Sequence, residues 1–427
     1  MSTAPVRTAS ALIGSKRAWF IWCLSALTFG YAFFHRVAPS VMVNELMTDF
    51  AIGAAVLGTL SALYFYPYVL MQVPLGAIID RIGARLLLTI ALVIAGAGSI
   101  IFAVADNIAM AYVGRTLIGV GSAVGFLGTL AIAAKWFPPH RFGFLAGFVM
   151  FFGMISGMMA QGPLAGFVEN FGWRAVMWSL GGFSLVLALM IFTFVRNQPE
   201  DIEVEDKPKE SWSSVWSKLG KALSTLEVWK TAIVASTMSG PMLTLGGLWA
   251  TPYLMVAYEL ERQQAAFFVS LLLLGWAFGA PFAGWLSDYI RKRKILLVSG
   301  AFVLMLCVAA IVFMPDAPLW LAVLLLALCG TSGAFMAITF PLIRENSPQE
   351  MSGSVTGIVN SMTVASGAIL QPAVGFVLDQ IWDGTTSQGA QVYQASDFRT
   401  GFIVVLASTF LGFLVSLTVK ESDFGNR

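Results

Sequence analysis

Charge is what this sequence has least of, and the scarcity is uneven along the chain. Only 11% of the 427 residues are charged, whereas 58% are hydrophobic. None of the 23 acidic residues falls in the middle of an apolar run. A mean hydropathy of +0.80 with so few charges excludes an ordinary soluble domain. The net charge of only +2 gives no reason to expect a nucleic-acid partner.

Cysteine is equally rare, and its positions exclude two further classes of protein. Cys23, Cys307 and Cys329 stand alone within apolar runs, so neither a disulfide framework nor a metal site is expected. The sequence has no His-Glu-x-x-His motif, no phosphate-binding loop and no nucleophile–base constellation at a run end. A membrane enzyme is therefore disfavoured, and no cofactor is expected. A receptor is also disfavoured, because no large extramembrane segment exists to signal.

What the chain does contain is long apolar runs, each near the roughly 20 residues that cross a bilayer as a helix. These runs predict an all-α membrane protein with twelve transmembrane helices. The predicted spans are 18–43, 53–79, 86–105, 108–134, 142–168, 172–195, 229–257, 265–290, 295–314, 318–343, 352–378 and 400–419.

The distribution of basic residues predicts the orientation. Most of the 25 Lys and Arg lie in the two tails and in every second loop, whereas the opposite loops hold only Arg174, Arg262 and Arg399. Because basic loops stay in the cytoplasm, both termini are expected there. The expected location is a bacterial inner membrane.

Two segments half a chain apart indicate an internal duplication. GAIIDRIGAR, from Gly76 to Arg85, forms a short polar turn after the second run, and a weaker copy, GWLSDYIRKRK, begins 208 residues later at Gly284. Four further residues return with a spacing of 210: Gly143, Gly147, Gly157 and Gln161 recur as Gly353, Gly357, Gly367 and Gln371. Two pseudo-symmetric six-helix bundles with close-packed glycines are what a rocking transporter requires.

The chain therefore divides into five predicted parts. Residues 196–228 also contain an apolar face formed by Trp212, Val215, Trp216, Leu219, Leu223 and Leu226, which is typical of an interfacial helix. The alternative is an unstructured, solvated linker. The predicted parts are a cytoplasmic tail (1–17), the N-terminal bundle (18–195), a cytoplasmic linker with the interfacial helix (196–228), the C-terminal bundle (229–419) and a second tail (420–427).

GAIIDRIGAR resembles the signature loop of the major facilitator superfamily, G-x-x-x-D-R-x-G-x-R, at every specified position. The later copy and the Arg of GRTLIGVG extend the resemblance over essentially the whole chain. It implies a central cavity, alternating access and a latch on the cytoplasmic side. The implied gating residues are Gly76, Asp80, Arg81, Gly83, Arg85, Gly284 and Asp288.

Within that superfamily, HRVAPSVMVNEL and YFYPYVLMQVPLGAIIDR look like the organic anion:cation symporter branch. The resemblance implies that Arg36 and Arg115 serve an anionic substrate. Two residues depart from the branch, since His35 and Ser122 stand where many members carry acids. Organophosphate antiporters are similar in the first helix, but this chain has no Arg in its seventh.

Arg36 and Arg115 are also the two charges placed deepest in the predicted spans. At 1.5 Å per residue both should lie roughly 10–12 Å below the outer surface. Because a charge at that depth is costly, both should face a wet cavity, where guanidinium groups could clamp a carboxylate or phosphate. The alternative is that these arginines, Arg115 above all, bond backbone carbonyls and brace the N-terminal bundle.

Other polar groups complete the predicted substrate site. His35 is the group within the spans that titrates near neutral pH, and it either carries a coupling proton or serves as a hydrogen-bonded spacer. For the remaining residues the alternatives are packing and helix–helix hydrogen bonding. They are Tyr31, Tyr64, Tyr68, Gln161, Trp249, Asn360 and Gln371.

The sequence thus predicts a monomeric secondary or facilitative transporter of a small carboxylate-bearing solute, either an organic anion or an amino acid or short peptide. With no buried carboxylate, the expected mode is facilitated diffusion or exchange of anions. The alternatives are a proton-coupled symporter that uses His35 and a drug or metabolite exporter. The predicted partners are an anionic or zwitterionic small molecule, a coupling proton or exchanged anion, and the lipid bilayer.

Overall fold

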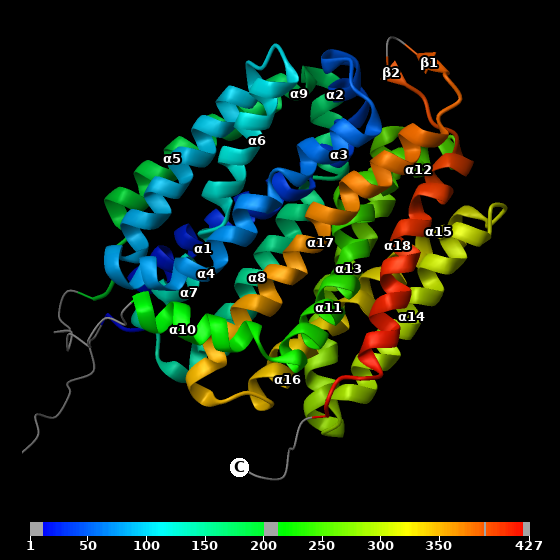
Figure 1. The fold of residues 1–427 in the computed structure, drawn as a ribbon. Helices are drawn as coiled ribbons and strands as arrows, with labels where there is room; N and C mark the ends of the chain where they lie inside the picture. The colour runs from blue at the N-terminus through cyan, green and yellow to red at the C-terminus, as the bar shows by residue number, and fades with distance from the viewer. Residues whose placement is uncertain (1–11, 200–211, 388–389, 422–427) are drawn as a thin grey trace, which may run out of the picture.

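The computed structural model describes residues 12–199, 212–387 and 390–421, and nearly all of them are helical (Figure 1). Eleven spans in these residues are long and apolar enough to cross a membrane. A further continuous segment, Leu226–Ala257, is interrupted in its middle by a π-helix. This segment coincides with the predicted seventh span, so the twelve predicted spans all correspond to helices.

The N-terminal half forms one group of helices. Their bounds are α1 (Lys16–Val37), η1 (Ala38–Val41), α2 (Val43–Phe50), α3 (Ala54–Ala62), α4 (Phe65–Ile82), α5 (Ala84–Ala103), α6 (Ile108–Ser122), α7 (Gly125–Trp136), η2 (Pro139–Arg141), α8 (Phe142–Met159) and α9 (Gly162–Phe194).

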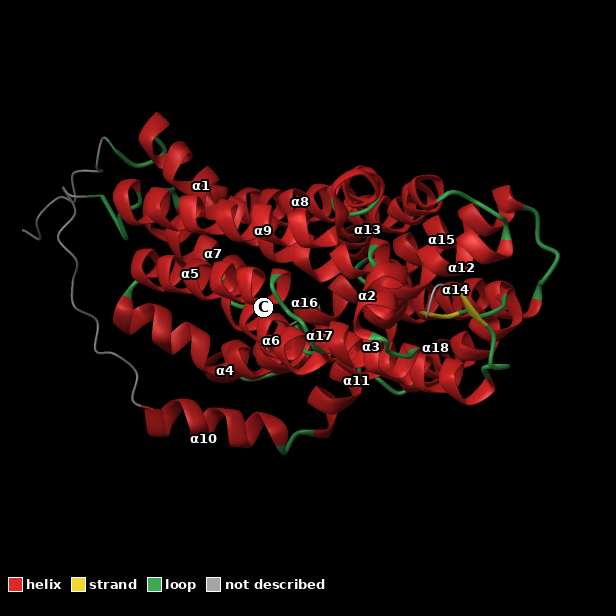
Figure 2. Ribbon diagram, turned by 90° about the horizontal axis from the view of Figure 1, so that it is seen from above, coloured by secondary structure: helices red, strands yellow, loops and turns green. Residues whose placement is uncertain are grey.

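The C-terminal half forms the second group, and a small hairpin precedes its last helix. Its elements are α11 (Leu226–Pro241), the π-helix η3 (Met242–Trp249), α12 (Ala250–Ala257), α13 (Arg262–Ile290), α14 (Arg293–Phe313), α15 (Leu319–Gly333), η4 (Ala334–Ile338), α16 (Thr339–Glu345), η5 (Gln349–Met351), α17 (Ser352–Ile381), β1 (Thr386–Ser387), β2 (Ala390–Gln391) and α18 (Ala395–Ser416). Figure 2 shows α5 and α7 on one side of the molecule and α14 and α18 on the other.

Glycines with positive φ separate helices that would otherwise run together. At Gly172 (φ 77°) the backbone leaves helical geometry, so α9 comprises the end of the fifth span and the whole of the sixth. At Gly83 (φ 87°) the chain turns between α4 and α5. Only glycine adopts such angles readily, which explains the role of Gly83 in the predicted turn.

Matching caps on the third helix of each bundle reflect the duplication. The first free backbone N–H groups of α5 and α14 have no local side-chain cap. The side chain of Asn197, just after the sixth span, accepts from Arg85 N at 2.8 Å. The carboxylate of Glu421, just after the twelfth span, accepts from Arg293 N and Lys294 N, both at 3.0 Å.

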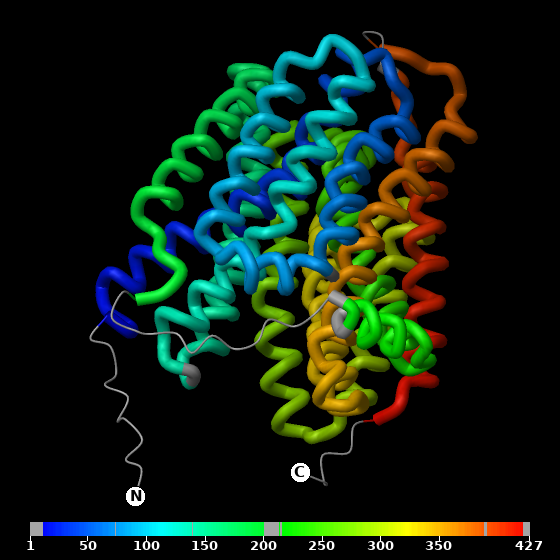
Figure 3. Tube along the Cα trace, turned by 60° about the vertical axis from the view of Figure 1, so that its left-hand side comes forward, coloured from blue at the N-terminus to red at the C-terminus, as the bar shows by residue number. Residues whose placement is uncertain are grey.

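The linker contains a helix, α10 (Trp212–Leu223), at the end of the molecule assigned above to the cytoplasm (Figure 3). We call this end the inner end and the opposite end, with α2 and the hairpin, the outer end. Leu219 and Ala222 pack in one cluster with Ile343 and Val355, whereas Trp216 is exposed. Nothing is described for the side chains of Trp212 and Val215 or for residues 1–11, 200–211 and 422–427 of the predicted tails and linker.

Candidate functional site

A cavity of about 890 Å³ opens at the inner end, between the two groups of helices. One wall is formed by α4, with Gln72, Gly76 and Asp80, and the opposite wall by the first turns of α17. Asn360 of α17 donates to the side-chain oxygen of Gln72 at 2.9 Å, so a polar bridge joins the two walls. The volume is suited to a small organic solute.

Arg36, on α1, contacts Tyr68, which lies one helical turn before Gln72 on α4. On α4, the residues that line the cavity end at Gln72, four positions after Tyr68. The centroid of the Tyr68 ring lies 5.1 Å from the Arg36 guanidinium. The rings of Phe33 (4.8 Å) and Tyr64 (5.8 Å) also face this group. Arg36 is only 6% exposed, so in this conformation the aromatic rings separate the charge from the open cavity.

Arg115 lies on the same tyrosine ring as Arg36. Its guanidinium is 5.0 Å from the Tyr64 centroid, and the residue is 3% exposed. The Nη1 group donates to the backbone oxygen of His35 at 2.8 Å, so Arg115 does brace the N-terminal bundle as the alternative above supposed. That bond uses only part of its capacity, because Nε and Nη2 are buried and have no partner.

Neither guanidinium is paired with a carboxylate within the described residues. The Nε group of Arg36 is buried and unpartnered as well. An uncompensated buried charge is costly, and buried polar groups are nearly always hydrogen-bonded in native proteins. Unused guanidinium donors at two neighbouring arginines are therefore the features of an anion-binding site.

His35 is held by a short hydrogen-bonded chain. The hydroxyl of Ser99 donates its one hydrogen to Ala95 O at 2.9 Å, so it accepts from its other neighbours. Those neighbours are Tyr31 Oη at 3.0 Å and His35 Nε2 at 3.3 Å. The network thus assigns a hydrogen to Nε2, while Nδ1 is buried without a partner.

The two glutamines related by the duplication both bind the π-helix η3. Gln161 Nε2 donates to Gly246 O and Gln371 Nε2 to Leu243 O, each at 2.7 Å. The Trp249 indole donates to Gln371 O at 3.0 Å. Gln161 and Gln371 therefore both contact η3, and Gly247 of that segment lies close to the backbone oxygen of Arg36. A π-helix leaves irregular backbone groups, which side-chain amides can satisfy.

The outer end is closed by close contact between α3 and α17. A Cβ atom added at Gly58 would lie 2.6 Å from Gln371 O, and one added at Gly375 would lie 2.2 Å from Ala54 O. The two helices therefore meet backbone to backbone. Glu45 and Arg262 form an ion pair of 2.6 Å across the same end. With its cavity open at the inner end, the molecule is in an inward-facing conformation.

The cavity is open at the position of the predicted inner latch in this conformation. Its lining includes three of the predicted gating residues, Gly76, Asp80 and Arg81. The Arg85 side chain donates to Phe192 O at 2.6 Å and so joins the start of α5 to the end of α9. Gly284 has open space around it, and Asp288 lies 3.3 Å from Arg293.

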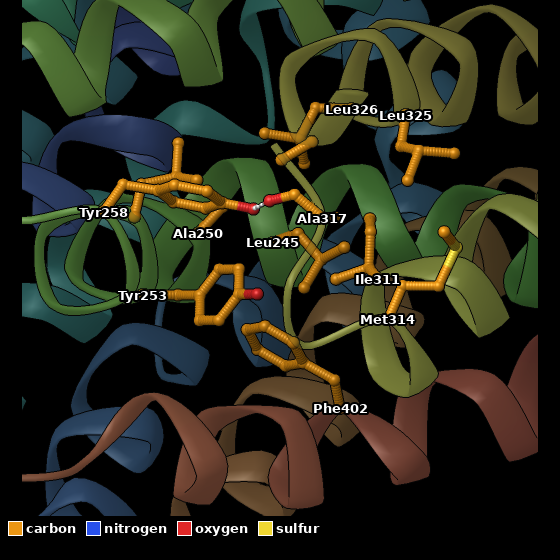
Figure 4. A pocket seen from close by; sticks show the side chains of 12 residues that line it. Leu245, Ala250, Tyr253, Tyr258, Ile311, Met314, Ala317, Leu325, Leu326 and Phe402 are labelled. Atoms are coloured by element: carbon orange, nitrogen blue, oxygen red, sulfur yellow. Dashed lines mark hydrogen bonds between the residues drawn. The ribbon is translucent and has the colours of Figure 1, made fainter. Parts of the chain in front are cut away.

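Two other pockets are poor candidates for the solute. The first, within the C-terminal group, is apolar and has a volume of about 10 Å³, roughly that of one water (Figure 4). Its polar groups include the hydroxyls of Tyr253 and Tyr258, and Tyr258 donates to Ala317 O at 3.0 Å. The second, of about 260 Å³, lies at the outer end and is lined by Trp249 and Tyr393. This second pocket lies on the outer side of the α3–α17 contact, whereas Arg36 and Arg115 lie on its inner side.

Sequence reasoning missed Gln72, Ser99, Asp379 and Tyr393. Gln72 lies eight residues before Asp80 in the same helix, so helical periodicity could have placed it on the cavity wall. Ser99 carries no signal that separates it from other serines in apolar runs. Asp379 was set aside with the other acids at run ends, and only the fold shows what it contacts.

Comparison with known proteins supplies the family. A family model described as Major Facilitator Superfamily matches residues 13–372. The chain is 22% identical over 401 residues to the Probable galactarate/D-glucarate transporter of Bacillus subtilis, with 84% of this chain and 86% of that protein covered. It is 23% identical over 385 residues to the Probable sulfoacetate transporter of Cupriavidus necator (86% and 88% covered). It is also 23% identical over 364 residues to the Probable L-galactonate transporter of Escherichia coli, with 81% of this chain and 79% of that protein covered.

Solved structures match the fold over nearly the whole chain. A bacterial homologue of the human lysosomal transporter Spinster, inward-facing and occupied, superposes with a TM-score of 0.79 at 16% identity, covering 95% of this chain and 97% of that one. The nucleoside transporter NupG gives a TM-score of 0.75 at 14% identity, with 95% and 100% covered. At these identities the likeness concerns the fold alone.

Proposed function

This chain belongs to the Major Facilitator Superfamily, and we propose that it carries a small organic acid across the membrane by alternating access. Membership confirms the predicted twelve-helix fold and the predicted class of function, a multi-pass membrane transporter rather than an enzyme. The substrate class, the residues that bind it and the mode of coupling are the parts that we propose.

The observation that carries the proposal is the pair of buried arginines without a carboxylate partner. Arg36 and Arg115 share the Tyr64 ring and retain unpartnered N–H groups. A carboxylate placed between them would accept from those donors and compensate one of the two positive charges. The aromatic rings of Phe33 and Tyr68 would then cover the apolar part of the same solute.

The relatives support an acid as the cargo. Their names specify galactarate or D-glucarate, sulfoacetate and L-galactonate, and each of these compounds carries an acidic group. Amino acids and short peptides, the second part of the sequence-based expectation, have no counterpart among these relatives. We therefore propose an organic anion, and a hydroxylated acid is the first compound to test.

The experiment is a binding screen followed by transport. Purified protein would be heated with sugar acids, sulfonates, amino acids and phosphorylated sugars, and acids alone are expected to raise the Tm. The best compound would then be used in counterflow, in which proteoliposomes loaded with unlabelled solute accumulate labelled solute. Stabilisation by neutral drugs and by no acid would favour the exporter alternative.

We propose that the protein works by exchange or facilitated diffusion, because none of the acids in the described part of the chain pairs with Arg36 or Arg115. His35 already uses Nε2 and its backbone oxygen, and a second proton on Nδ1 would place a positive charge beside Arg115. His35→Gln is therefore expected to leave counterflow within about twofold of the wild type. Uphill uptake driven by a pH gradient, and lost in His35→Gln, would establish the His35 proton symporter instead.

We propose that the protein lies in a bacterial inner membrane with its inner end in the cytoplasm and acts as a monomer. A cysteine at the exposed position Thr386, in the outer hairpin, is expected to react with an impermeant thiol reagent on intact cells. A cysteine at Lys292, between α13 and α14, is expected to react only after lysis. The reverse pattern would invert the assigned orientation.

A further inference from the structure

The first turn of α3 is capped by a residue from the other end of the sequence. Gly53, which precedes the helix, offers no side-chain oxygen to the free N–H groups. Ala54 N donates to Asp379 Oδ1 at 2.8 Å and Ala55 N to Asp379 Oδ2 at 2.9 Å. Asp379 lies near the end of α17, so these bonds join the N-terminal group of helices to the C-terminal group.

The surroundings of Asp379 fit this contact closely. The Tyr393 hydroxyl lies 2.5 Å from Asp379 Oδ1 and also contacts Gln391 Oε1, so these two acceptors share its single hydrogen, and it accepts from Ala54 N at 3.1 Å. Burial and the bond to Asp379 raise the pKa of Tyr393, so its phenol keeps the hydrogen that it donates. A Cβ atom at Gly53 would lie 2.8 Å from both carboxylate oxygens, so a larger residue there would displace the Asp379 side chain.

We propose that Asp379 is the latch of the outer gate, and that its carboxylate holds α3 against α17 whenever the cavity is open at the inner end. A negative charge at a helix N-terminus is favourable, and bonds from N–H groups to a carboxylate are stronger than neutral ones. The latch lies beside the Gly375–Ala54 contact and holds it closed. Outward opening must break both carboxylate bonds, so their strength sets the proportion of outward-open molecules.

The test is a thiol-labelling rate that follows outward opening. Ser61 lies on α3 one turn beyond Gly58, is 1% exposed, and has a buried hydroxyl without a partner. Ser61→Cys therefore loses no hydrogen bond. In a chain whose own three cysteines are replaced by alanine, this thiol should react from outside only in outward-open molecules. Because the reagent reports on conformation alone, the result does not depend on which solute is carried.

Asp379→Asn is expected to raise the labelling rate about tenfold, since the amide keeps one neutral acceptor and loses the charge. Tyr393→Phe and Gly53→Ala should change the rate in the same direction. Asp383→Asn is the matched control, because exposed Asp383 bonds within its own loop, to Thr385 N at 2.9 Å. It should label at the parent rate.

A rate in Asp379→Asn equal to that in Asp383→Asn would overturn the latch. If Asp379→Asn is not inserted into the membrane, Tyr393→Phe decides, and an unchanged rate in that variant overturns the proposal as well. Equal increases in Asp379→Asn and in the control would also count against it, because the effect would then belong to the loop rather than to the contact with α3.

Discussion

Arg36→Gln is expected to weaken binding of the transported acid roughly ten- to a hundredfold, because a charge-assisted contact contributes about 1.5–3 kcal/mol. Arg36 packs against aromatic rings, and its charge has no carboxylate partner among the described residues, so the substitution removes an uncompensated charge. The Tm without solute should therefore fall little or rise. Titration of the acid by calorimetry gives the affinity, and thermal unfolding gives the Tm.

Two further variants separate binding from bracing. Arg36→Lys is expected to recover only part of the affinity, because an ammonium group lacks the planar fork of guanidinium. Arg115→Gln should weaken binding and also lower the Tm, since it loses the 2.8 Å bond to His35 O. Arg141, exposed at the inner end, supplies the control, and Arg141→Gln should leave both quantities unchanged. Wild-type affinity in Arg36→Gln would remove the proposed anion site.

Gly375→Ala is expected to abolish most transport by preventing closure of the outer end. The new methyl group would lie 2.2 Å from Ala54 O, which is a backbone atom and cannot rotate away. Forcing such a contact costs about 1–3 kcal/mol, so the closed state should become roughly ten- to a hundredfold less populated. Counterflow should fall accordingly, while the protein stays folded, because the two helices can separate.

Gly357→Ala is the matched control for that variant. Gly357 lies on the same helix, but a Cβ atom there would meet nothing within 4 Å. Its counterflow should stay within about twofold of the wild type. The rate of Ser61→Cys labelling should rise in the Gly375→Ala background. Normal counterflow in Gly375→Ala would show that the observed approach of α3 and α17 is not needed for transport.

The fold could be predicted from the sequence because a bilayer imposes a fixed length on every span. The seventh span illustrates the limit of that rule. Its position was predicted as 229–257, but apolar composition gives no sign of the π-helix Met242–Trp249 within it. Irregular backbone of that kind depends on partners from other helices, here Gln161 and Gln371, whose pairing no local pattern specifies.

The candidate site was predictable only in part, for a related reason. Arg36 and Arg115 stood out because buried charge is rare in such a chain. Both contact Tyr64 because three separate helices meet in the fold. The hydrogen bond from Ala54 N to Asp379 joins residues that are 325 positions apart in the sequence. The glycines near the inner end were expected in close contact, yet Gly143, Gly147, Gly353 and Gly357 face open space in this conformation.

The π-helix η3 is hydrogen-bonded by both halves of the molecule. Duplication placed one glutamine at the same position in each half, and both copies now hold the same eight-residue segment of the second half. Gln371 belongs to the half that contains η3, so its bond stays within that half, whereas the bond from Gln161 joins the two halves. Two residues at equivalent positions thus have different roles in this conformation: one stabilises the irregular backbone of its own half, and the other ties that backbone to the opposite half.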